Sequence, residues 1–70
     1  MKDGKRSINR DAVYSRQEAA EILGVSLSTL KKLIDAGYLR VSHPVGVRRI
    51  FIQGSSILEM LDHTALERQL

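Results

Sequence analysis

The side chains best suited to bind a ligand form a stripe in a short segment, residues 27–35. Leu27, Ser28, Lys31, Lys32 and Asp35 follow a spacing of i, i+1, i+4, i+5 and i+8, which places them on one face of a helix. Lysine can donate to guanine O6 and N7, serine can contact either type of base pair, and an apolar side chain can touch a thymine methyl group. The stripe could therefore read base edges in the major groove. A solvated helix face with two ordinary lysines is the simpler alternative.

Two hydroxyl side chains stand at the start of the same segment. Ser26 is the expected N-cap of this helix. Thr29 and the free amide groups of the first turn are placed to contact a phosphate. We therefore add both residues to the predicted contact surface.

Further cations lie on either side of this segment. Arg48 and Arg49 are neighbours on an expected strand, where side chains alternate, so one normally lies against a given surface. An arginine on such a strand can enter the minor groove or pair with phosphate, although charges that protect an edge strand from aggregation are an alternative. The remaining predicted DNA contacts are Arg40 beside this pair and, nearer the N-terminus, Lys5, Arg6, Arg10 and Arg16.

The charge of the chain is uneven along its length. Residues 1–50 hold ten Lys and Arg against five Asp and Glu, a balance of +5, whereas residues 51–70 hold one against three, a balance of −2. A basic body with an acidic end indicates a polyanionic partner for the first part.

Other chemistries find little support in the sequence. The absence of cysteine excludes disulfides, cysteine-ligated zinc and a thiol nucleophile. His43 and His63 have no cluster of ligands around them, and the five glycines are isolated, so no phosphate-cradling loop is present. We expect no enzyme activity, no metal and no cofactor. The longest apolar run has three residues, 50–52, and predicts no contact with a membrane.

Local signals predict the elements that position these side chains. Ser15 and Glu18 form a capping box that opens a helix ending at Gly24, and a second helix runs from the cap Ser26 to Gly37. The short connection, residues 24–26, requires the two helices to cross steeply.

The rest of the chain predicts a hairpin and a last helix. Alternating residues over 38–42 and 47–52 indicate two strands joined by a type I turn at 43–46. A second capping box, residues 56–59, opens the last helix, whose inward residues are expected to be Ile57, Leu58, Leu61, Ala65 and Leu66.

Together these elements predict a mainly α fold with a small β-hairpin: a winged helix-turn-helix in the order helix-helix-hairpin-helix. Ala20, Gly24 and Val25, followed by Leu30 and Leu33, occupy the positions that such a unit needs to be small, tolerant of positive φ, or apolar. We expect a flexible basic arm over residues 1–12 and a DNA-binding domain over residues 13–70.

Residues 13–62 resemble the excisionase family of winged-helix proteins, which are related to the DNA-binding head of MerR-type regulators. The resemblance rests on a Glu-Ala-Ala-x-x-Leu-Gly-Val-Ser core, an Ala-Gly-Tyr-Leu exit from the second helix, an Arg-Arg strand and a Ser-x-x-x-Glu-x-Leu helix. It implies a second helix in the major groove, a wing in the adjacent minor groove, DNA bending and excision with a tyrosine integrase. The wing turn and Leu27 depart from the family pattern.

Three functions remain open at this point. The first is an excisionase, or recombination directionality factor, of a phage or mobile element, with double-stranded DNA, possible cooperative self-association on it, and a tyrosine integrase as partners. The second is a small MerR-like transcriptional regulator, and the third is a winged helix that binds another protein. Either DNA role predicts a cytoplasmic, nucleoid-associated protein of a bacterial cell or a phage-infected host.

Overall fold

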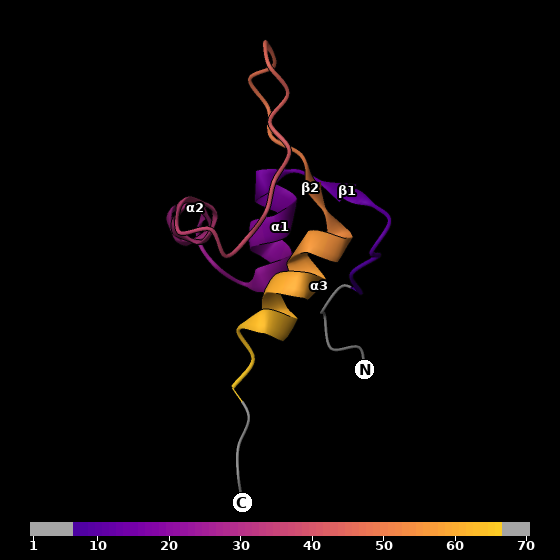
Figure 1. The fold of residues 1–70 in the computed structure, drawn as a ribbon, viewed down its shortest axis with the longest axis vertical. Coiled ribbons are helices and arrows are strands. Elements are labelled where there is room, and N and C mark those ends of the chain that lie inside the picture. The colour runs from indigo at the N-terminus through magenta and orange to yellow at the C-terminus, as the bar shows by residue number, and fades with distance from the viewer. Residues whose placement is uncertain (1–6, 67–70) are drawn as a thin grey trace, which may run out of the picture.

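Three helices and one short antiparallel strand pair make up the protein, as a computed structural model covering residues 7–66 describes it. The elements are β1 (Val13–Tyr14), α1 (Arg16–Leu23), α2 (Leu27–Asp35), β2 (Ile52–Gln53) and α3 (Gly54–His63). The chain between α2 and β2 projects as a long loop beyond the helices (Figure 1), and we call residues 38–52, which include the first residue of β2, the wing. The architecture is mainly helical and confirms the predicted winged helix-turn-helix class.

The first helix begins and ends where its local signals predict. The Glu18 amide donates to Ser15 Oγ over 3.1 Å, and the Ser15 amide donates to Glu18 Oε1 over 2.8 Å, which completes the capping box. Gly24 ends the helix with a left-handed φ of 71°, so that the Val25 amide can donate to the Ala20 carbonyl. These local bonds fix the direction in which the chain leaves α1.

The second helix crosses the first steeply, as predicted, and Figure 1 shows α2 end-on while α1 lies along the plane of the view. Ser26 is its N-cap, and the left-handed Gly37 follows its last turn. The amides of Tyr38 and Leu39 both donate to the Leu33 carbonyl. The first residues of the wing therefore form the C-terminal cap of α2.

The sheet differs from the predicted hairpin. β1 pairs with β2, in the register Val13 to Gln53 and Tyr14 to Ile52, while the two sides of the wing share only one bridge, between Ser42 and Phe51. The predicted strands at 38–42 and 47–52 are shortened because the former begins by capping α2 and the latter ends by pairing with β1. The alternating pattern could not reveal this second partner.

The wing turn also differs from the predicted type I turn at 43–46. The Val47 amide donates to the Pro44 carbonyl over 3.2 Å, so the turn spans residues 44–47. Gly46 then occupies the third position with a φ of +84°, the conformation that a type II turn requires there.

The last helix begins at Gly54, earlier than the predicted capping box at 56–59. No side chain caps it; the amides of Gly54 and Ser55 instead donate to the carbonyls of Ala12 and Arg10. Backbone from a distant part of the chain thus replaces a local cap. The predicted inward positions shift accordingly: Ile57 and Met60 are buried and Leu58 half-buried, whereas Leu61 is 43% exposed and residues 65 and 66 lie exposed beyond the helix.

The same contacts alter the predicted boundary between arm and domain. A Cβ atom at position 54 would stand 1.9 Å from the Asn9 carbonyl oxygen, so only glycine admits this approach. Residues 9–12 pack on α3, and the packed domain begins before residue 13. Lys5 and Arg6 lie outside the described residues.

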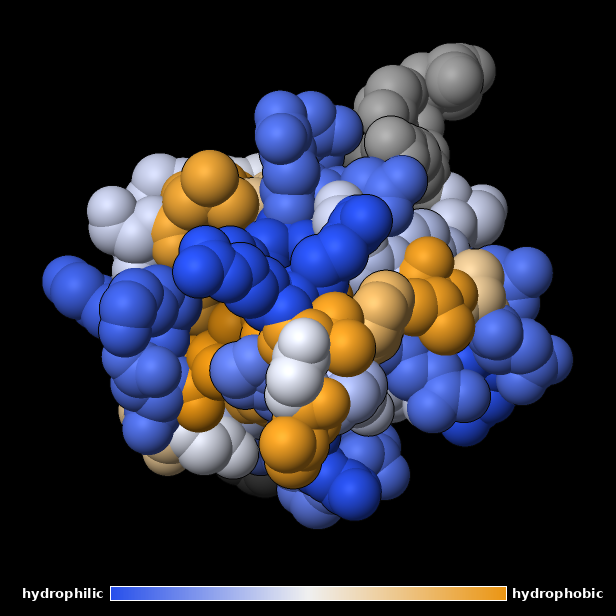
Figure 2. All heavy atoms as spheres, turned by 90° about the horizontal axis from the view of Figure 1, so that it is seen from above, coloured by the Kyte–Doolittle hydropathy of each residue, from blue (hydrophilic) through white to orange (hydrophobic). Residues whose placement is uncertain are grey.

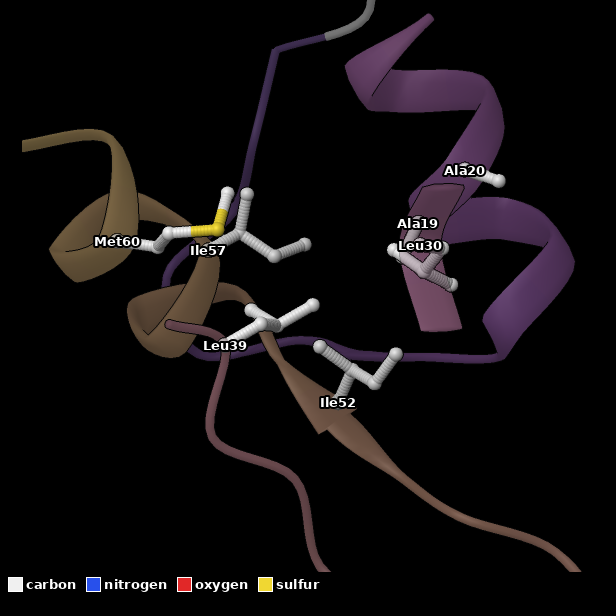
Figure 3. Packing of buried hydrophobic residues seen from close by; sticks show 7 residues of the cluster. All are labelled: Ala19, Ala20, Leu30, Leu39, Ile52, Ile57 and Met60. Carbon is white, nitrogen blue, oxygen red and sulfur yellow. The ribbon is translucent and has the colours of Figure 1, made fainter. Parts of the chain in front are cut away.

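A small hydrophobic core joins all these elements. Its buried side chains, drawn in Figure 3, come from the three helices, β2 and the base of the wing: Ala19, Ala20, Leu30, Leu39, Ile52, Ile57 and Met60. Leu39 and Ile52 anchor the two ends of the wing, so the core fixes where the wing leaves the helices. Over the described range 7–66, no helix is long and apolar enough to cross a membrane.

Candidate nucleic-acid interface

A groove opens between the start of α1, the exposed face of α2 and the wing. It gathers six of the predicted contact residues from three separate parts of the chain: Arg16, Leu27, Ser28, Lys31, Arg48 and Arg49. Apolar side chains of α2 and the wing, Ile34, Val41 and Ile50, also line it. The fold thus brings together residues that the sequence separates by more than thirty positions.

The α2 wall of the groove carries the stripe predicted from helical spacing. Leu27 is 54% exposed, although it is a large hydrophobic residue at the helix start. One turn further along, Lys31 Nζ forms a 2.6 Å ion pair with Asp35 Oδ2, both of them largely exposed. The face therefore offers an apolar contact, a hydroxyl and a cation held by a neighbouring carboxylate.

Other predicted residues of α2 lie outside the groove. Ser26 Oγ accepts from the Thr29 amide and donates to Thr29 Oγ1, each over 3.1 Å, so these two hydroxyl groups cap the helix. The Thr29 amide is therefore engaged in the helix cap, and the predicted phosphate contact of Thr29 and of the first-turn amides stays a prediction. Lys32 is exposed but does not line the groove.

Both wing arginines line the groove, whereas alternation on a strand predicted one. The difference arises because residues 48 and 49 are not in a regular strand and their side chains need not alternate. His43 also lines the groove, and its Nε2 lies 3.2 Å from the Val47 carbonyl oxygen, bracing the wing. Sequence analysis missed His43 as part of this surface, since its only signal was its place in the turn.

Arg40 lies elsewhere, contrary to its predicted place beside the wing arginines. Its Nη1 atom is 3.8 Å from Glu59 Oε1 of α3, and it borders a separate small hollow with Gln53 and Ser56. Arg10 is exposed and does not line the groove; its carbonyl accepts from Ser55 at the start of α3. Neither cation contributes to the groove.

The groove is cationic and has no feature of a metal centre. Arg16, Lys31 and the two wing arginines face one carboxylate, Asp35. Among residues 7–66, no three His, Cys, Asp or Glu side chains are grouped to hold a metal ion. Seen from the wing end, strongly hydrophilic groups lie directly beside exposed hydrophobic groups near the middle of the molecule (Figure 2). Such a surface suits a ligand with anionic edges and apolar or hydrogen-bonding faces between them, as DNA has.

Comparison with known proteins agrees with this geometry. The family model of the helix-turn-helix domain matches residues 13–64, a range that contains every element from β1 to α3. Neither the curated proteins nor the solved structures gave a significant match. Because the matched range spans most of the chain, the protein belongs to the helix-turn-helix domain family, and this domain implies DNA binding.

Proposed function

We propose that the protein is a non-enzymatic, architectural DNA-binding protein of the excisionase type, which binds and bends DNA to promote excision by a tyrosine integrase. The observation that carries DNA contact is the groove, where Arg16 of α1, Lys31 of α2 and the wing arginines meet. The excisionase role rests on the resemblance of residues 13–62 to that family.

In the proposed complex, α2 enters the major groove. Leu27, Ser28 and Lys31 then face base edges, while Arg16 at the start of α1 lies beside the sugar-phosphate backbone, as first helices of this motif do. Arg48 and Arg49 reach the strand that borders the neighbouring minor groove. Phosphate contacts set the register, and the α2 face supplies the sequence preference.

A mobility shift on DNA flanking the protein's own gene, with excess nonspecific competitor at physiological salt, tests this proposal first. Discrete complexes are expected, and they should appear stepwise where copies of the protein bind adjacent sites. An excision assay with a tyrosine integrase encoded nearby then tests the role: excision should rise with added protein. DNA binding without any effect on excision would favour the MerR-like regulator, and no shift at any salt concentration would favour a protein-interaction module.

A further inference from the structure

The tip of the wing carries a side chain that the proposed contacts do not use. Val45 is fully exposed, at 101%, and is the most exposed large hydrophobic side chain that the structure describes between residues 7 and 66. It stands at the second position of the turn over residues 44–47, the part of the wing that projects furthest from the helices (Figure 1).

Hydrogen bonds brace this tip despite its exposure. The Val47 amide donates to the Pro44 carbonyl, His43 Nε2 contacts the Val47 carbonyl, and two 2.8 Å bonds join Ser42 to Phe51 further down. The proline ring fixes one further backbone angle. An apolar side chain on a braced turn loses little conformational freedom when it binds.

The chemistry of the tip restricts what it can do on DNA. Pro44, Val45 and Gly46 have no side-chain donor or acceptor, so they can neither pair with phosphate nor read a base edge by hydrogen bonding. Arg48 and Arg49, which can pair with phosphate, follow within four residues. When these two arginines contact the phosphates of one DNA strand, the apolar tip extends past that strand, toward the minor groove.

We propose that Val45 is a wedge that inserts between base pairs from the minor groove and kinks the DNA. Apolar wedges of this kind partly unstack one base step and bend the duplex toward the major groove. The proposal rests on the DNA-binding function above and supplies a source for the bend. Flexible pyrimidine–purine steps are the expected sites of insertion, because they unstack most easily.

The test uses a duplex selected by the wild-type protein from a random-sequence pool, with 2-aminopurine placed at successive positions beneath the wing. Wild-type protein should raise 2-aminopurine fluorescence at one step and bend the duplex, as measured by energy transfer between its ends. Val45→Ser should abolish the fluorescence rise, reduce the bend and weaken binding about tenfold. Val45→Ile should keep all three.

Val13→Ser is the matched control, since Val13 is also exposed but lies on β1; it should behave as wild type. A Val45→Ser protein that still unstacks and bends the DNA would overturn the wedge and leave DNA binding intact. A loss of cooperativity alone, with the bend of the single complex unchanged, would assign the tip to protein contact and also overturn it. Failure of the wild type to select any duplex would instead refute the proposed function.

Discussion

Lys31 Nζ and Asp35 Oδ2 lie 2.6 Å apart on the wall of the groove that faces the proposed DNA. An exposed pair of this kind contributes little to folding, about 0.5 kcal/mol. Its consequence is for recognition: the carboxylate orients the ammonium group and opposes phosphate that approaches the same place. In the proposed complex, we expect the pair to favour a DNA sequence that satisfies both groups over one that offers only charge.

Replacing Asp35 should weaken this discrimination. For Asp35→Asn, affinity for unrelated DNA should rise by a few-fold, because one anion leaves the cationic groove, while affinity for the selected site should rise less or fall. Competition binding with both duplexes at one salt concentration measures the ratio. An equal rise for both duplexes would show that Asp35 adjusts only the overall charge.

The two adjacent lysines of α2 provide a direct test of the groove. Lys31 lines it and Lys32 does not, yet each substitution to alanine removes the same charge. Lys31→Ala should lower affinity for the selected duplex about tenfold, the effect of one lost base contact, and Lys32→Ala only about twofold. Equilibrium binding to one duplex compares them. Equal losses would place the contact surface elsewhere on α2.

The wing arginines should act on all DNA sequences alike. Loss of either Arg48 or Arg49 removes one phosphate contact. The negative slope of log affinity against log salt concentration should therefore become shallower by about 0.9. Arg40→Ala is the matched control because Arg40 lies near Glu59 and outside the groove. A salt titration of the three variants gives the slopes, and a comparable change for Arg40 would argue against the proposed orientation.

Folding depends on the close approach of Gly54 to Asn9. Gly54→Ala would place a methyl group 1.9 Å from a backbone oxygen and should destabilise the protein by about 2–3 kcal/mol. For a domain of this size the loss corresponds to a Tm lowered by about 10 °C or more. Ser55→Ala, one residue further along, should be nearly neutral. Thermal unfolding followed by circular dichroism distinguishes them.

The capping box of α1 should contribute a smaller amount. Ser15→Ala removes the bond accepted from the Glu18 amide and should cost about 1 kcal/mol. Gln17→Ala, in the first turn of the same helix, has no such cap bond and serves as its control. Urea unfolding of the two variants gives the difference, and equal midpoints would show that the cap bond adds no stability.

The sequence predicts those structural features that depend on contacts between residues close together in the chain. The caps Ser15 and Ser26 and the left-handed Gly24 depend on bonds within five residues, and all three were predicted correctly. The start of α3 was not, because it depends on backbone from residues 10–12 and no local residue type signals that contact. Register between distant segments is decided by the whole core.

The site divides in the same way. Helical spacing alone placed Leu27, Ser28 and Lys31 together, and these residues do line the groove. Arg40 was predicted beside the wing arginines but lies near Glu59 of α3, a neighbour nineteen residues away that local spacing does not reveal. Both wing arginines reach the groove because the bridge between Ser42 and Phe51 does not continue as a strand.

The exposed outer wing has a consequence for how such a protein can diversify. Residues 42–49 are all exposed, whereas the anchors Leu39 and Ile52 are buried. Insertions, deletions or exchanges within this stretch leave the core packing untouched. Loops of other lengths and compositions that replace residues 42–49, between the half-buried Val41 and Ile50, would therefore change the surface offered to a ligand while keeping the core that holds the wing.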